Sequence, residues 1–261
     1  MKIHAYALCW NEEAMLPYYL RHYEKFCDKI IIYDNMSTDR SQQIILNHPL
    51  CELRTYDSQE KIRDDLYLEI KNNVWKECRG KGIDYVIVGD MDEFVFHNDL
   101  KHFLEKNKKY SIFEPVGIEM VSLNFPQTDD QIYSVVNTGL YEWEFCKKII
   151  FSPDRVQEIS FIPGCHHHKD SAEISKHPIW IYNSDNYYPS KDPLKSELKL
   201  LHFKFIGIDY VNERHKLMAK RLSKFNIEEG TRIKGQPYGH HYYNDATEVI
   251  KKFTNNSIKI F

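Results

Sequence analysis

One stretch of the sequence carries an apolar strand straight into a run of acids, Asp84-Tyr85-Val86-Ile87-Val88-Gly89-Asp90-Met91-Asp92-Glu93-Phe94. Its first five residues, 84–88, have the apolar and β-branched composition of a buried strand. The acidic residues Asp90, Asp92 and Glu93 follow directly after this strand ends. In open α/β sheets ligands bind beyond the carboxyl ends of the strands, so this junction is the first place to expect a functional site.

Strands and helices alternate on the N-terminal side of this stretch. Residues 3–10 and 29–33 are predicted strands, and each is followed by a polar segment and then by a helical pattern. A third predicted strand, 51–56, precedes an amphipathic helix whose apolar residues recur at four-residue spacing: Ile62, Leu66, Ile70, Val74 and Cys78. The β-α-β-α order predicts an α/β fold with a mostly parallel, Rossmann-like mixed sheet and helices on both of its faces.

The second half of the chain is mixed rather than alternating. Short apolar segments separated by prolines and polar turns fill residues 112–151, which predicts strands added antiparallel to the edge of the sheet. Residues 183–195 have the composition of a loop, and 198–205 that of another short strand. A helix is expected over about 209–225, followed by a tail.

Size and composition narrow the class of protein. The 261 residues suffice for one large unit with a substantial core. The 35 basic and 38 acidic residues give a net charge of −3, and neither sign forms a long block, so composition offers no case for nucleic-acid binding. A small-molecule partner is expected instead.

The sequence also bears on where the protein works. Its six cysteines are widely spaced and form no C-x-x-C pair, which fits buried thiols in a reducing cytoplasm. Glu12 and Glu13 come too early for a signal peptide, and no apolar run reaches the length of about 18 residues that a membrane span requires. We expect a cytoplasmic protein, with peripheral contact at the inner face of the membrane as a further option.

Asp90 and Asp92 are two carboxylates one residue apart at the end of the predicted strand. Hard oxygen ligands of this kind suit Mg²⁺ or Mn²⁺, which keep water or substrate phosphate in their remaining positions. A metal ion held there can bridge a diphosphate and stabilise it as a leaving group. The alternative is a solvated acidic turn, the ordinary explanation of an isolated D-x-D triplet.

Three ordered motifs carry a resemblance to a known family: Ala7-Leu8-Cys9-Trp10-Asn11-Glu12-Glu13, then Ile30-Ile31-Ile32-Tyr33-Asp34-Asn35-Met36-Ser37-Thr38-Asp39-Arg40-Ser41, then Gly89-Asp90-Met91-Asp92-Glu93-Phe94. Together they resemble the family 2 glycosyltransferases and the related family 92 group, in the branch whose D-x-D motif extends to D-x-D-E-F. The resemblance covers about the first hundred residues, and more weakly continues to about residue 205.

The resemblance implies a GT-A fold, a nucleotide-sugar donor (a UDP-sugar first) and a divalent metal, Mn²⁺ or Mg²⁺. It further implies a GT-A domain over 1–205, with a nucleotide-sugar-binding half at 1–110 and an acceptor-side half at 111–205. A C-terminal helical extension would then occupy 206–261.

The resemblance also implies roles for individual residues. Asn11, Glu12 and Asp34 map onto the nucleoside contacts, Asp90 onto the ribose and metal, and Asp92 onto the metal. Chemistry supports Asp34 independently, because a carboxylate at a strand end accepts hydrogen bonds from a base or a ribose hydroxyl. Ser37 and Asp39 are expected to cap the turn and helix that follow.

Later candidates are less tightly defined. Arg63 is expected either to pair with Asp64 or Asp65 or to reach the donor phosphates. His202 resembles the late histidine that serves as a third metal ligand in many GT-A enzymes, and Lys204 stands where it would neutralise phosphate. A buried structural histidine is the alternative for His202.

The base that would deprotonate the acceptor hydroxyl in an inverting reaction is not clear from the sequence. The E-D motif usual in the family is replaced by a histidine-rich stretch that includes His166, His167 and His168. Adjacent residues on a strand point to opposite faces, so these three are not expected to share one zinc ion. Glu119 and Asp170 are the candidate bases, and a surface carboxylate is the alternative for each.

These observations predict a metal-dependent, inverting glycosyltransferase that acts on a glycan or glycolipid acceptor. One alternative is a nucleotidyltransferase or another nucleotide-sugar enzyme, although the acidic 11–13 segment stands where such enzymes carry a glycine-rich basic loop. The other is a degenerate sugar-binding module. A basic C-terminal helix could approach an anionic lipid or a phosphate-bearing acceptor, but a solvated helix face is the simpler explanation of its charges: Arg214, Lys216, Lys220, Arg221 and Lys224.

Overall fold

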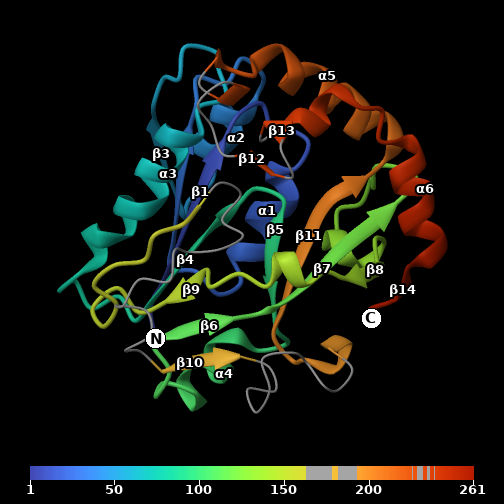
Figure 1. Cartoon of the computed structure of the whole chain (residues 1–261). Helices are drawn as coiled ribbons and strands as arrows, with labels where there is room; N and C mark the ends of the chain where they lie inside the picture. Colours follow the sequence, from blue (N-terminus) through green and yellow to red (C-terminus); the bar gives the residue numbers. More distant parts are fainter. Residues whose placement is uncertain (163–177, 182–192, 225, 228–231, 234–235, 238) are drawn as a thin grey trace.

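The computed structural model describes residues 1–162, 178–181, 193–224, 226–227, 232–233, 236–237 and 239–261. It confirms the predicted alternation at the start of the chain (Figure 1). The elements in order are β1 (Ile3–Cys9), α1 (Leu16–Tyr23), β2 (Lys29–Asp34), α2 (Ser41–Leu46), β3 (Cys51–Thr55), α3 (Asp64–Asn73) and β4 (Tyr85–Asp90).

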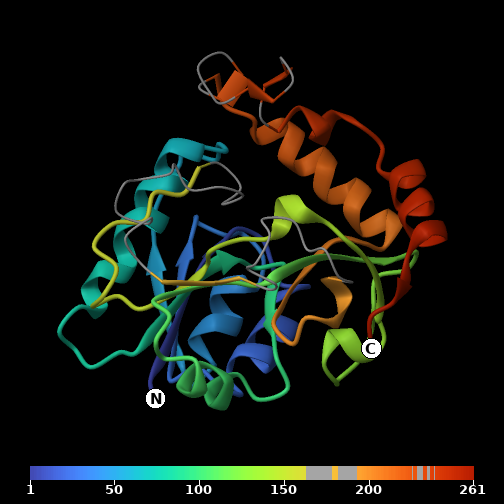
Figure 2. The same ribbon diagram turned by 60° about the horizontal axis from the view of Figure 1, so that its bottom comes forward.

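Within the described residues, the central sheet has seven strands in the order β10-β6-β9-β4-β1-β2-β3. Neighbours among β4, β1, β2 and β3 are parallel, and β9 (Ile150–Phe151) runs antiparallel to both of its neighbours, β4 and β6. The predicted mixed α/β fold with a largely parallel sheet is therefore confirmed. Because crossovers are right-handed and the chain reverses direction across the sheet after β3, α1 and α2 cover one face and α3 covers the other (Figure 2).

The strands between 112 and 206 depart from the expected arrangement. β9 lies inside the sheet rather than at its edge, because β6 (Ile112–Glu114) and β10 (Ile179–Ile181) extend the sheet beyond it. Strands from this region join β5 and β14 in a second sheet, in the order β14-β8-β7-β11-β5. Its members are β5 (Glu93–Phe96), β7 (Val116–Ser122), β8 (Thr138–Tyr141), β11 (Lys199–Ile206) and β14 (Ile258–Lys259).

Several helical segments were shorter than expected or absent from the sequence analysis. The helix predicted from Ile62 to Cys78 is α-helical only over α3, and then tightens into the 3₁₀ turn η1 (Val74–Cys78). The remaining short elements are α4 (Leu100–Lys106), η2 (Ile132–Ser134), η3 (Trp143–Phe145), η6 (Pro193–Lys195), β12 (Arg232–Ile233), β13 (Gln236–Pro237) and η8 (His240–Tyr243).

The C-terminal region is built around α5 (Ile208–Arg221) and α6 (Thr247–Asn256). Gly207 precedes α5 with φ +81°, and a Cβ at this position would lie 2.5 Å from the backbone nitrogen of Phe125. Val211, Ala246 and Ile250 form a small apolar cluster that joins the two helices outside the main core. Figure 2 shows α5 running across the molecule above the sheets. None of the described helices is long and apolar enough to cross a bilayer.

Candidate functional site

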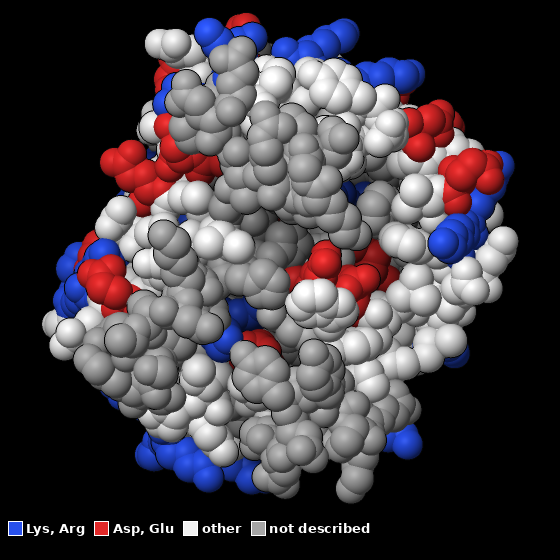
Figure 3. Space-filling model, in the orientation of Figure 1, with Lys and Arg blue, Asp and Glu red and all other residues white. Residues whose placement is uncertain are grey.

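A cavity of about 240 Å³ opens where β1 and β4 end. Its walls come from the loop after β1, the start of α3, the turn between β4 and β5, the middle of β11 and one face of α5. The face that it opens on is hollowed near its middle (Figure 3). The position agrees with the general rule that α/β sheets bind ligands beyond the carboxyl ends of their strands.

Asp90 is the last residue of β4, and Asp92 lies in the turn that leads into β5. Both carboxylates line the cavity, as the strand-end position predicted. Oδ1 of Asp90 accepts a hydrogen bond of 2.5 Å from the Lys71 ammonium on α3. The backbone N–H of Asp90 donates to Oε2 of Glu93, which closes the turn.

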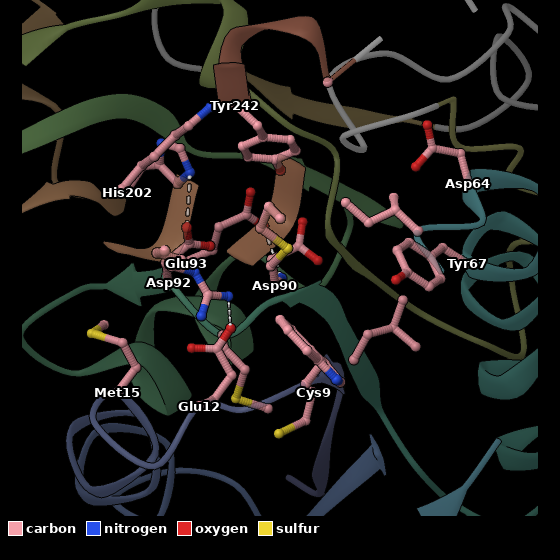
Figure 4. A pocket seen from close by; sticks show the side chains of 18 of the residues that line it. Cys9, Glu12, Met15, Asp64, Tyr67, Asp90, Asp92, Glu93, His202 and Tyr242 are labelled. Atoms are coloured by element: carbon pink, nitrogen blue, oxygen red, sulfur yellow. Dashed lines mark hydrogen bonds and ion pairs between the residues drawn. The ribbon is translucent and has the colours of Figure 1, made fainter. Parts of the chain in front are cut away.

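Glu93 and Lys147 form an ion pair beneath the two aspartates, with side chains only 1% and 2% exposed. Glu93 belongs to the acidic run expected at the site, but neither residue was given a role there from sequence. Both line the cavity, so the base of the site contains a charge pair rather than apolar packing. In Figure 4, Glu93 lies beside Asp92 and His202 on one side of the cavity, and Asp64 and Tyr67 lie on the other.

His202 on β11 connects Asp92 to Glu119 on β7. Its Nδ1 lies 2.9 Å from Oε2 of Glu119, and its Nε2 lies 3.5 Å from Oδ2 of Asp92. β11 brings the three together because it pairs with both β5 and β7, which places His202 opposite Glu93 in one register and Glu119 in the other.

The charges around His202 act strongly on its pKa. Burial lowers this pKa, but the carboxylates of Glu119 and Asp92 outweigh burial and raise it to about 10. In turn, although desolvation acts the other way, His202 holds the pKa of Asp92 well below its usual range. Without a metal ion, an imidazolium between two carboxylates is therefore the stable arrangement.

The positions of Asp90, Asp92 and His202 can be compared with the geometry that a divalent metal ion requires. In the described part of the chain, no group of three or more His, Cys, Asp or Glu side chains is already arranged to hold a metal ion. The Lys71 ammonium on Asp90 is one reason. Two ligands each about 2.1 Å from one ion lie about 3.0–3.4 Å apart. The 3.5 Å between Asp92 and His202 is close to this, so the pair fits a metal once Nε2 loses its proton.

Glu119 has the position of a group that orients a metal-binding histidine. A carboxylate that accepts the Nδ1–H fixes the tautomer in which Nε2 can bind a metal. Glu119 is 2% exposed, does not line the cavity, and its second oxygen, Oε1, is buried without a partner in the described residues. The structure thus places this predicted base behind His202 rather than at the cavity wall. Asp170, the other predicted base, lies outside the described residues, as do His166, His167 and His168.

Glu12 and Arg214 form a second ion pair in the cavity wall, from the loop after β1 and from α5. Glu12 is 7% exposed. Burial raises its pKa to about 7, although Arg214 acts in the opposite direction. Glu12 was expected at the site from sequence, but its partner, 202 residues away, was not.

Asn11 and Asp34 support the loop after β1 and are not part of the cavity wall. Asn11 adopts φ 50°, and its side-chain oxygen accepts the backbone N–H of Thr38 at 2.8 Å. Asp34 is fully buried and accepts hydrogen bonds from Ser37 and Gln42. Asp39 accepts the N–H of Ser41 at 2.9 Å at the start of α2, but the N-cap residue of this helix is Arg40 rather than Asp39.

Arg63 and Lys204 differ in their relation to the cavity. Arg63 pairs with Asp65 at 2.5 Å, which was one of its two expected roles, and it does not line the cavity. Lys204 does line the cavity, and its Nζ lies 3.3 Å from Nε2 of His241. Desolvation lowers the pKa of Lys204, against the nearby charges of Glu119 and Asp92.

The prediction that the basic residues of the C-terminal helix form a solvated face is wrong for both arginines. Lys216, Lys220 and Lys224 are exposed, but Arg214 and Arg221 line the cavity. They are seven residues apart, so α5 presents both on one face, about 10 Å from each other along its axis. That face was not distinguishable from sequence because the helix carries cations on several sides.

Comparisons with known proteins add a likeness in fold. No family model and no curated protein matches the sequence. Among solved structures, residues 1–349 of S. aureus TarS in complex with UDP-GlcNAc align with 97% of this chain and 74% of that one, at 12% identity and a TM-score of 0.44. A longer S. aureus TarS structure aligns with 90% of this chain, which spans only 41% of its length, at 14% identity and a TM-score of 0.40.

A further solved structure is 4-diphosphocytidyl-2C-methyl-D-erythritol synthase, which aligns with 59% of this chain and 76% of its own, at 12% identity and a TM-score of 0.35. Similarity at this level does not transfer an activity or a ligand. The function is therefore inferred from the residues of the cavity itself.

Proposed function

We propose that the protein is a glycosyltransferase that takes a sugar from a nucleotide-diphosphate donor, a UDP-sugar first among the candidates, and passes it with inversion to a glycan or glycolipid acceptor. The observation that carries the proposal is the meeting of Asp90, Asp92 and His202 at one cavity beyond the ends of β1 and β4. We place the reaction in the cytoplasm, with the inner face of the membrane as the alternative site of the acceptor.

In this proposal Asp90, Asp92 and His202 would hold a Mn²⁺ or Mg²⁺ ion. Such an ion would stabilise the negative charge of the departing diphosphate. Glu119 would keep His202 in the tautomer that binds the ion. Lys204, which already lines the cavity, would face the phosphates.

The remaining predicted residues keep narrower roles. Glu12 is the nucleoside-side residue that lines the cavity, and Asn11 and Asp34 would act by holding its loop. A direct contact of Asp34 with the nucleoside would require it to leave Ser37 and Gln42. Glu119 could take the proton of the acceptor hydroxyl only if His202 moved aside. Asp170 remains the other predicted catalytic base.

Calorimetric titration tests the proposal most directly. UDP, ADP, GDP and CDP would be titrated in turn into the protein with Mn²⁺, with Mg²⁺, and with a chelator. We expect one nucleoside diphosphate to bind, and the chelator to weaken its binding, because the ion that would offset the diphosphate charge is removed. Asp92→Asn should show the same weakening in the presence of metal while remaining folded, although loss of its pairing with His202 lowers its stability. Binding that neither the chelator nor Asp92→Asn changes would rule out the metal assignment.

Product analysis separates the alternatives. A glycosyltransferase releases a nucleoside diphosphate from a nucleotide-sugar, whereas a nucleotidyltransferase releases pyrophosphate from a nucleoside triphosphate and a sugar phosphate. A degenerate sugar-binding module would bind a sugar and release neither product. Pyrophosphate release in the absence of diphosphate release would replace the proposed function with the second one.

A further inference from the structure

Arg221 ends α5 and lies at the cavity with two nitrogens unused. Its side chain is 5% exposed, and its guanidinium carbon lies 3.4 Å from the centre of the Trp10 ring. Nε donates to the backbone carbonyl of Glu60 at 3.3 Å. Nη1 and Nη2 are both buried, and the described residues supply neither with an acceptor.

Three other cations that line the cavity differ from Arg221 in this respect, because each has a carboxylate partner. Lys71 pairs with Asp90, Lys147 with Glu93, and Arg214 with Glu12. Among the described residues, Arg221 has no carboxylate within ion-pair distance. A buried charge without a counter-charge or acceptors costs stability, so such a group is retained where a ligand completes it. Burial also lowers the pKa of Arg221, although Tyr67 and Tyr56 act against this change.

Trp10 fixes the guanidinium in one plane. It directly follows β1 and is part of the same cavity wall as Glu12, so the stack joins α5 to the loop that the proposed function assigns to the donor nucleotide. A guanidinium held on a ring cannot turn its two terminal nitrogens elsewhere, and together they match two oxygens of a phosphate. A neutral carbonyl would satisfy the N–H groups but not the charge.

We propose that Arg221, stacked on Trp10, is an oxyanion site that binds a phosphate group of the donor nucleotide. This inference rests on the proposed function for the identity of the ligand, but not for the existence of an anion site. Arg214, two turns earlier on α5, is already paired with Glu12, so of the two arginines Arg221 is the one free to bind a phosphate beside Lys204.

The test compares Arg221→Met with wild type by calorimetric titration of UDP, uridine and inorganic pyrophosphate. We expect the variant to bind UDP and pyrophosphate about 10- to 100-fold more weakly, since hydrogen bonds to charged groups are lost, and uridine equally well. Its unfolding temperature should stay equal or rise, because an uncompensated buried charge has been removed. Arg221→Lys keeps the charge without the fork and should give an intermediate loss.

Arg79→Met is the matched control. Arg79 also stacks on a tryptophan, Trp75, at 4.8 Å, but it lies outside the cavity and donates to the carbonyls of Pro153, Val156 and Gln157. This variant should lose stability and keep wild-type binding. If Arg221→Met is too unstable to study, Arg221→Lys and Trp10→Leu measure the same loss.

The outcomes are distinguishable. Equal binding of UDP by wild type and by the Arg221 variants would overturn this inference and leave the proposed function standing. An equal loss of uridine and UDP would place Arg221 on the base and overturn the phosphate assignment. Pyrophosphate binding that depends on Arg221, with no nucleotide bound, would support the anion site and overturn the proposed function. If the wild-type protein binds neither UDP nor pyrophosphate, both this inference and the proposed function are overturned.

Discussion

Glu93 and Lys147 show how individual side chains maintain the base of the cavity. Each is almost fully buried, and Glu93 also accepts the N–H of Asp90. The pair therefore ties the D-x-D turn to the segment that leads into β9. A buried pair of this kind contributes little net stability relative to an apolar pair, but breaking it leaves one charge stranded.

We expect Glu93→Gln to lower the free energy of unfolding by about 3–5 kcal/mol, because the Lys147 ammonium would stay buried without its carboxylate. The double variant Glu93→Gln/Lys147→Met should recover most of this loss. Urea unfolding of the wild type, both single variants and the double variant measures the coupling. Additive losses in the double variant would show that the two side chains do not act as a pair.

Sequence identified some cavity residues and missed others for a physical reason. Asp90 and Asp92 were predicted because strand-end position and residue type suggest a metal ligand, and His202 because it resembles the late histidine of GT-A enzymes. Lys147 and Arg214 were missed because their roles depend on partners 54 and 202 residues away. Local patterns carry no information about such contacts.

At the scale of elements, α5 is the helix that completes the cavity, and Gly207 sets its direction. The positive φ of Gly207 is unfavourable for residues with a Cβ, and the backbone of Phe125 occupies the space that a Cβ would need. A substitution there must shift the start of α5, and with it Arg214 and Arg221.

We expect Gly207→Ala to lower stability by more than about 2 kcal/mol, by strain and by collision together. Gly80→Ala is the control, because Gly80 has φ +69° but no atom within 4 Å of an added Cβ. It should show the strain alone, about 1–2 kcal/mol. Thermal unfolding gives both values, and equal losses in the two variants would mean that the contact with Phe125 is unimportant.

The elements themselves were predictable to different degrees. The alternation up to β4 followed from periodicity and turn residues, which are local. The arrangement of 112–206 was not, because β7 joins β11 across about eighty residues and β9 inserts between β4 and β6, which both precede it in the sequence. Two-residue strands such as β9 carry no periodic signal at all.

Across the whole molecule, stability should depend on pH through His22. His22 is 3% exposed, lies against Phe94, and has Nε2 2.9 Å from the carbonyl of Val95. Burial lowers its pKa to about 4, although the contact with Val95 acts the other way. When pH falls below 6.5, the ordinary pKa of histidine, His22 takes up a proton in the unfolded chain but stays neutral in the folded protein. The contribution of His22 to the free energy of unfolding is fully present above pH 6.5 and is lost as pH falls towards 4.

We therefore expect His22→Phe to flatten the acid side of the stability profile, by about 2 kcal/mol between pH 7 and pH 5 relative to wild type. The difference between the two proteins is the relevant quantity, because burial raises the pKa of Glu12 to about 7 and that of Asp64 to about 6, which act in the opposite direction. Chemical denaturation at several pH values measures it. Parallel stability profiles of the two proteins would exclude His22 as a source of the pH dependence.

The ion pair between Glu12 and Arg214 has a consequence for the order in which the protein matures. A ribosome makes the loop after β1 early and α5 about two hundred residues later. During that interval the nascent chain can form β1 to β4, but the cavity lacks the wall that carries Arg214 and Arg221. A chain still emerging from the ribosome therefore has no complete ligand site, and the ligand can stabilise only a molecule whose α5 has docked.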